Sequence, residues 1–137
     1  MLCDEGADNF LGASAYTTAA EALAIGREFG LDPRVTLEVV NSSTGRSFNT
    51  EVVLKQDMIT GRYGTGFALG LLAKDVGIAA DLADAVGVDA PACQLDRNRW
   101  AEAAAGLGFA GGPFRGAQAV VGHRPERGLE YRLSVHI

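Results

Sequence analysis

The sequence is poor in several features by which whole classes of protein are recognised. Its two cysteines, Cys3 and Cys93, are far apart and follow no spacing typical of metal ligands or of a disulfide framework. The N-terminus MLCDEGAD is acidic where a signal peptide would be basic, and no apolar run is long enough to span a membrane. We therefore expect a reduced, cytoplasmic protein without a membrane segment, in which both cysteines are inert.

Positive charge is also scarce. The 137 residues carry 12 basic and 17 acidic side chains, a net charge of −5, and only two lysines, Lys55 and Lys74. Nucleic-acid binding depends mostly on Lys and Arg that neutralise phosphates, so this balance argues against a nucleic-acid partner. The imbalance is local, because residues 111–137 carry four arginines against two glutamates. This shift predicts a domain at residues 1–110 and an atypical tail at residues 111–137.

The sequence also lacks the residue patterns typical of metal sites, dinucleotide-binding loops and catalytic acid–base pairs. His123 and His136 both lie in the tail, so no histidine cluster predicts a metal site. Gly106, Gly108 and Gly111 spell G-x-G-x-x-G, but the dinucleotide-binding form of this motif needs a preceding strand and a βαβ unit, and neither fits here. The acidic residues that follow the central segment are interpreted as a solvated face rather than an acid–base pair: Asp81, Asp84 and Asp89.

The chain is instead rich in helical periodicity. The apolar spacing and the Asp, Ser, Pro and Gly residues that begin or end helices predict five of them, joined by short connectors. At 47% hydrophobic residues the chain can bury a core of its own. We therefore expect an all-α domain. Its helices are predicted from Asp8 to Phe29, from Pro33 to near Asn41, after Ser47, from Gly66 to Gly87, and from near Pro91 through Ala104.

The Gly66–Gly87 segment is the most informative of the five. Asp75 lies on its apolar stripe, so its carboxylate needs a hydrogen bond or a basic partner. Lys74 lies on a second line, together with Phe67, Gly70, Gly77 and Asp81. The glycines either let a ligand approach the backbone or admit a neighbouring helix beside a solvated lysine, and periodicity alone favours the second interpretation. The stripe predicted to face a core consists of Leu71, Leu72, Val76, Ile78, Ala79, Leu82 and Val86.

The tail follows a different pattern. From Leu129 to Ile137 apolar and polar residues alternate strictly, which is strand periodicity. With Ala117 to Val121 this segment predicts a β-hairpin. A lone hairpin is only marginally stable, so we expect it to dock on the helices or to stay disordered.

Three runs carry a resemblance to a known family: DNFLGASAYTTAAEALAIGREFGLDPRV, VVNSSTGRSF and GFALGLLAKDVGIAADLADAVGVDAP. Over about residues 8–109 they are similar, in order and spacing, to the helical C-terminal domain of the β-hydroxyacid dehydrogenases, which is of the 6-phosphogluconate dehydrogenase-like type. This is the family of 3-hydroxyisobutyrate dehydrogenase and tartronate semialdehyde reductase. The resemblance implies that a complete member has an N-terminal Rossmann domain for NAD or NADP, acts on a small hydroxyacid, and oligomerises through this helical domain.

The resemblance also implies roles for individual residues. The family's Lys-x-x-x-Asn motif supplies a general acid–base and a substrate contact; Asn9 matches its asparagine, whereas Glu5 stands at the lysine. Glu5 cannot replace a lysine beside an anionic hydroxyacid, so we expect no catalytic residue in this chain. Lys74 and Asp75 match cofactor-binding positions, and Phe67 matches an aromatic that lines the substrate cleft. The resemblance thus favours a ligand-facing Lys74.

We therefore predict a stand-alone or truncated substrate-binding and oligomerisation domain of an NAD(P)-dependent 3-hydroxyacid dehydrogenase, inactive and without bound cofactor when alone. Its expected partner is a second copy or a chain with a Rossmann domain. The face near Phe10, Gly12 and Phe67 is predicted to be exposed and to associate. A non-catalytic helical module for homodimerisation or partner binding is the alternative, and a coding sequence with frameshifts at both ends is a third.

Overall fold

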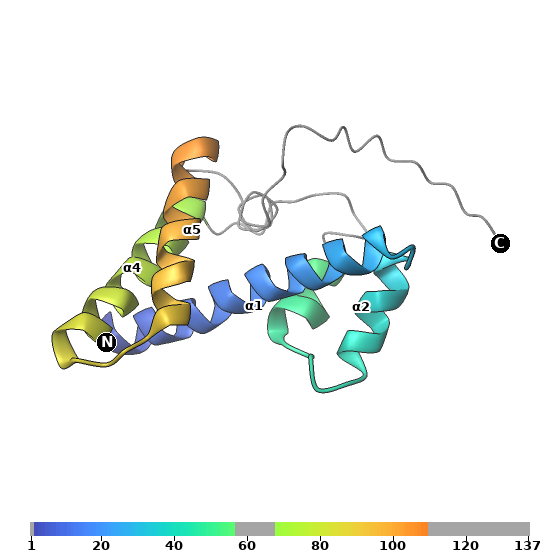
Figure 1. The fold of residues 1–137 in the computed structure, drawn as a ribbon, viewed down its shortest axis with the longest axis horizontal. Helices are drawn as coiled ribbons and strands as arrows, with labels where there is room; N and C mark the ends of the chain where they lie inside the picture. The colour runs from blue at the N-terminus through green and yellow to red at the C-terminus, as the bar shows by residue number, and fades with distance from the viewer. Residues whose placement is uncertain (1, 57–67, 110–137) are drawn as a thin grey trace.

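A long helix, α1 (Leu2–Glu28), is the spine of the molecule (Figure 1). The computed structural model describes residues 2–56 and 68–109. At about 1.5 Å per residue, the 27 residues of α1 span roughly 40 Å. The helix begins six residues before the predicted Asp8. Asp4 and Glu5 lie in its first turn, where carboxylates stabilise the positive end of the helix dipole.

The remaining described elements are also helical. Their ends follow the predicted signals: the Asp32 carboxylate accepts a hydrogen bond from the Arg34 amide at 2.8 Å, and Gly87 ends its helix with a φ of 72°. Within these residues the chain is all-helical, with no strand, as predicted. The elements after α1 are α2 (Pro33–Asn41), the π-helical turn η1 (Asn49–Val53), α4 (Leu69–Val86) and α5 (Pro91–Leu107).

Both ends of α1 carry other helices. The helices α4 and α5 pack against each other and against its N-terminal part, whereas α2 and η1 lie along its C-terminal half (Figure 1). One hydrophobic core runs beneath both groups, so the two halves form a single packed unit. Its buried members are Ala13, Tyr16, Leu37, Leu54, Leu69, Leu72, Val76, Trp100 and Ala103.

The segment between α2 and η1 is fixed by polar side chains. The Ser47 hydroxyl accepts a hydrogen bond from the Thr50 amide at 3.1 Å, while the Thr50 hydroxyl accepts one from the Ser47 amide at 2.8 Å. This reciprocal capping confirms Ser47 as the start of the third helix. Asn49, which is buried, donates from Nδ2 to the Gly12 carbonyl at 2.8 Å and ties η1 to the middle of α1.

Only part of the stripe predicted for α4 is buried. The buried line runs through Leu69, Leu72, Val76 and Ala80, at the spacing of one helix face. The prediction that Leu71 and Val86 face the core is wrong, because these residues are 40% and 63% exposed. The predicted stripe combined two neighbouring lines of the helix.

The predicted association face is also partly wrong. Phe10 is half-buried and packs against the hydrophobic core, so it is not an exposed anchor. Phe67 and the predicted hairpin lie outside the described residues. None of the helices described here is long and apolar enough to cross a membrane. The exposed apolar side chains are instead frequent at the end of α1, in the connector that follows it and on α2, a region called here the α1–α2 corner. They are Ile25, Phe29, Leu31, Val35 and Val39.

Candidate functional site

Two polar side chains far apart in the sequence meet where α1 packs on α4. Asn9 Nδ2 donates a hydrogen bond to Asp75 Oδ2 at 3.1 Å, and both residues are half-buried. The partner predicted for Asp75 is therefore the side-chain amide of Asn9 on α1, not a basic side chain. Because Asp75 Oδ2 accepts one N–H of Asn9, the second N–H and the amide oxygen of Asn9 have capacity for a ligand.

Gly6 brings the two helices close enough for this bond. It lies three residues before Asn9 in α1 and is buried. A Cβ at Gly6 would stand 3.5 Å from the Ala79 nitrogen and 3.6 Å from the Asp75 carbonyl oxygen, so α1 meets the backbone of α4 there. An alanine would make ordinary contacts at these distances, but a side chain longer than alanine would push α4 away, and Asp75 with it. Gly6 lies outside the helix predicted from the sequence, which begins at Asp8, so its role at this contact was not predicted.

The charged candidates flank this pair in solvent. Glu5 precedes Asn9 by four residues, which places both on one face of α1, and Glu5 is exposed. Lys74 is exposed beside Asp75 on α4. Phe67 lies outside the described residues. The structure thus joins Asn9 directly to Asp75 and leaves the charges of Glu5 and Lys74 free to meet a ligand or water.

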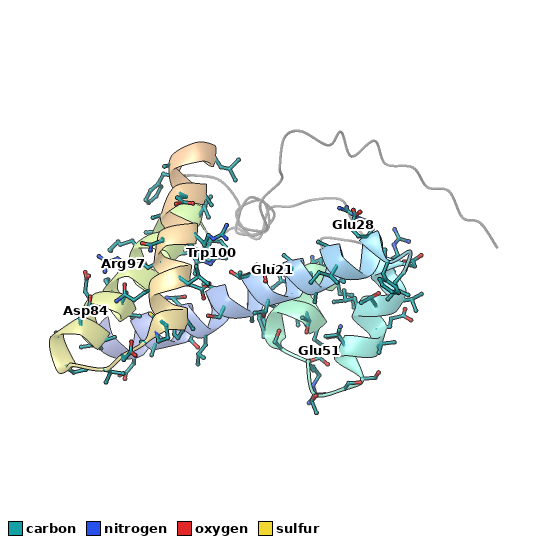
Figure 2. All side chains as sticks on the ribbon, viewed as in Figure 1. Glu21, Glu28, Glu51, Asp84, Arg97 and Trp100 are labelled. Carbon is teal, nitrogen blue, oxygen red and sulfur yellow. The ribbon has the colours of Figure 1, made fainter. Side chains whose placement is uncertain are left out.

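A second polar contact, between α1 and α5, was not predicted. Asp96 is buried and accepts a hydrogen bond from the Ser14 hydroxyl. One turn further along, Trp100 Nε1 donates to the Thr17 hydroxyl at 3.1 Å, where α5 crosses α1 (Figure 2). The available signal was the pairing of Ser14 and Thr17, three apart on α1, with Asp96 and Trp100, four apart on α5.

Cys93 lies next to this contact but has no reactive character. Burial raises the pKa of its thiol, and the nearby Asp96 and Asp84 carboxylates raise it further, while Arg97 opposes them. The thiolate is the nucleophilic form, so a raised pKa leaves Cys93 protonated at neutral pH. This agrees with the prediction that it is inert.

The acidic face of α4 has a structural partner on α5. Arg97 forms an ion pair with Asp81 at 2.9 Å and lies 4.0 Å from Asp84, both of which are on α4 (Figure 2 labels Arg97 and Asp84). Gln94 Nε2 donates to Asp84 at 2.9 Å. Asp81 and Asp84 remain largely exposed, so this network is a solvated helix–helix contact. Over the described ranges, no group of three or more His, Cys, Asp and Glu side chains could hold a metal ion.

Comparison with known protein families identifies the family of this helical domain. Residues 7–113 match the family described as "NAD-binding of NADP-dependent 3-hydroxyisobutyrate dehydrogenase". The chain belongs to this family. The matched residues include Asn9, Lys74 and Asp75, and they confirm the family that the three sequence runs resemble.

Individual members of the 3-hydroxyisobutyrate dehydrogenase family align with part of the chain. The 3-hydroxyisobutyrate dehydrogenase of Pseudomonas aeruginosa is 38% identical over 85 residues, which cover 58% of this chain and 28% of that protein. The 2-(hydroxymethyl)glutarate dehydrogenase of Eubacterium barkeri is 34% identical over 74 residues, or 54% and 25%. The chain thus spans about a quarter of the length of these curated relatives.

Solved structures show the same fold. The 3-hydroxyisobutyrate dehydrogenase of Salmonella typhimurium superposes with a TM-score of 0.74 at 24% identity, over 83% of this chain and 40% of that one. The Mycobacterium tuberculosis 3-hydroxyisobutyrate dehydrogenase, solved with L-serine, gives 0.73 at 24% identity, over 86% and 41%. These likenesses establish that this family member has the helical fold of 3-hydroxyisobutyrate dehydrogenases.

The Asn9–Asp75 bond leads to a stability prediction for this family member. Asp75→Ala should lower the free energy of unfolding by about 1–2 kcal/mol, because it removes a hydrogen bond to a charged, half-buried group. Lys74→Ala should change it by less than about 0.5 kcal/mol, since Lys74 is exposed. Thermal unfolding followed by circular dichroism measures both. Equal effects from the two substitutions would contradict this placement of the α4 face.

Proposed function

We propose that the chain supplies the ligand-facing helical part of an NAD(P)-dependent 3-hydroxyacid dehydrogenase and does not turn over substrate by itself. The observation that carries the proposal is the hydrogen bond from Asn9 to Asp75 at 3.1 Å. It joins the two runs that the family resemblance assigns to substrate and cofactor. A small hydroxyacid would bind at Asn9, and NAD or NADP at Lys74.

The described residues can contact part of a bound NAD or NADP molecule. Lys74 is an exposed cation, so it can contact an anionic or polar group of a dinucleotide. The described residues contain helices only, and a dinucleotide fold needs parallel strands, so the resemblance assigns that part to a Rossmann domain. The nicotinamide ring, when bound, exchanges a hydride with the substrate carbon.

The role of this chain's own residues follows from their positions. Asp75 fixes the amide of Asn9, so that its second N–H and its oxygen point in one orientation toward a substrate hydroxyl or carboxylate. Removing or adding the hydroxyl proton needs a general acid–base. Glu5 stands where the family resemblance places a lysine for that task, and its negative charge repels an anionic hydroxyacid. Binding residues are therefore present without the residue that moves the proton.

An activity assay on the purified chain tests this proposal. We expect no NAD- or NADP-dependent oxidation of 3-hydroxyisobutyrate, glycerate or L-serine, the compound solved with the Mycobacterium tuberculosis relative. Loss of a positioned acid–base group alone typically costs about 10² to 10⁴ in rate. Sustained turnover that Lys74→Ala abolishes would show that the chain is a complete enzyme and would contradict the proposal.

A non-catalytic association module is the second candidate, favoured by the apolar corner of α1 and α2. Phe29 is 88% exposed there, and Ile25, Val35 and Val39 are each more than half exposed. Apolar surface of this kind is often buried by association with a second copy or a partner chain. Sedimentation at micromolar concentration distinguishes a homo-oligomer from a monomer.

Either function is proposed to operate in the cytoplasm, although the human relative is named as mitochondrial.

A further inference from the structure

Phe109 links the end of α5 to the start of α4. Gly108 follows α5 with a φ of 85°, in the left-handed region that favours glycine, and turns the chain back. The Phe109 carbonyl then accepts a hydrogen bond from the Gly70 amide at 3.0 Å. That amide lies in the first turn of α4, where backbone donors have no partner within the helix.

The ring of Phe109 takes the place of a side chain at position 70. A Cβ built on Gly70 would stand 2.5 Å from Cε2 and 2.6 Å from Cγ of the ring, distances that no real Cβ tolerates. Gly70 is buried, whereas Phe109 is 62% exposed, so the ring covers the glycine and keeps its outer part in solvent. Gly77, on the same line of α4, has nothing within 4 Å of such a Cβ. The close approach is thus specific to Gly70.

We infer that Phe109 is a positioning residue for Lys74, an inference that rests on the proposed cofactor role of Lys74. Residues four apart on a helix have Cβ atoms about 5–6 Å apart, so the ring at position 70 is a direct neighbour of the Lys74 side chain. Long helical side chains lean toward the N-terminal turn, which directs Lys74 toward the ring. Its methylene stem packs along the ring and its ammonium lies over the exposed ring face, with its outer side still in solvent, near the start of α4.

This role accounts for two glycines that the sequence left unexplained. Gly108 was part of a rejected dinucleotide motif, and Gly70 was one of two glycines flanking Lys74. Gly108 turns Phe109 back toward α4, and Gly70 leaves the space that the ring occupies. Together they give the solvent-facing lysine a fixed aromatic neighbour on an otherwise open helix face.

Lysine methyl signals test this inference directly, because the chain has only two lysines, Lys55 and Lys74. Reductive methylation with ¹³C-formaldehyde labels both lysines and the N-terminal amine, and Lys55→Arg and Lys74→Arg assign the two lysine signals. We expect the Lys74 methyl signal upfield of the Lys55 signal, since a proton above an aromatic ring is shielded. The measurement uses neither cofactor nor hydroxyacid, so its failure is distinguishable from failure of the proposed dehydrogenase role.

Variants separate positioning from mere structural support. Phe109→Leu should move the Lys74 signal to the position of the Lys55 signal, and Phe109→Tyr should retain the upfield shift. Gly70→Ala should also abolish the shift, because its Cβ displaces the ring; this variant maintains the test if Phe109→Leu does not fold. Phe29→Leu, at another exposed phenylalanine, should leave both signals unmoved.

Two results would overturn the inference. One is coincidence of the Lys74 and Lys55 signals in the unsubstituted protein. The other is a Lys74 signal that stays unmoved in folded Phe109→Leu or Gly70→Ala, even if the melting temperature falls, since that pattern indicates a structural role for the ring alone.

Discussion

Trp100→Ala should lower the free energy of unfolding by about 3–5 kcal/mol, the usual effect of truncating a buried aromatic residue. The Trp100 side chain is fully buried between α1 and α5. Its ring lies edge-to-face with Tyr16, with centroids 6.3 Å apart, and its Nε1 donates to Thr17. Domains of this size have about 5–15 kcal/mol of total stability, so the variant should melt at least about 10 °C lower or fail to fold.

Matched variants on α5 show whether this effect is specific. Leu95→Ala removes an apolar side chain that is 58% exposed, so it should change stability by less than about 0.5 kcal/mol. Trp100→Phe keeps an aromatic ring but leaves the Thr17 hydroxyl without its donor, and should fall between the two. Similar melting temperatures for Trp100→Ala and Leu95→Ala would contradict the position of Trp100 in the core.

Glu5→Lys should produce the largest change in activity once a cofactor-binding part is supplied. A chimera can join the portion of the Pseudomonas aeruginosa relative that precedes the position equivalent to Leu2 to residues 2–137 of this chain, so that position 5 comes from this chain alone. With lysine at position 5, four residues before Asn9, the proposed acid–base group and the proposed substrate contact would share one helix face. We expect the lysine chimera to oxidise 3-hydroxyisobutyrate about 10² to 10⁴ times faster than the Glu5 chimera.

Asp8→Lys is the control for this change. Asp8 is another exposed acidic residue in the first half of α1, and its replacement alters the net charge by the same amount. It should give no comparable rate, because the family resemblance places the proton-transfer lysine four residues before Asn9, whereas Asp8 directly precedes Asn9. Equal rates for the two lysine variants would show that bulk charge, rather than a positioned group, is responsible.

Much of the fold could be predicted because its signals are local. Asp32 followed by Pro33 begins α2, Ser47 caps the third helix, and Gly87 ends α4, as their backbone preferences require. The start of α1 was wrong because no capping residue marks it in the sequence. For α4 the helical periodicity was predicted correctly, but the predicted buried face was too wide. Only packing against α1 and α5 decides which of the neighbouring rows of side chains faces the core.

The candidate site depended on contacts that no local pattern encodes. The sequence predicted that Asp75 needs a partner, but Asn9 lies 66 residues away and was singled out by resemblance alone. Ser14 and Asp96 look like ordinary surface residues until α5 crosses α1. Phe109 reaches Gly70 only because Gly108 turns the chain back after α5. Such contacts follow from the tertiary arrangement of helices whose periodicity is local.

The ratio of kcat values for the Glu5→Lys and Glu5 chimeras, at saturating NADP and 3-hydroxyisobutyrate, tests most directly whether this chain is a dehydrogenase domain that binds ligand but lacks the proton-transfer group. Both chimeras must first bind NADP equally, measured by fluorescence titration. The account predicts a ratio of about 10² or more. A ratio near one, or no turnover by a folded Glu5→Lys chimera that binds NADP, would contradict it.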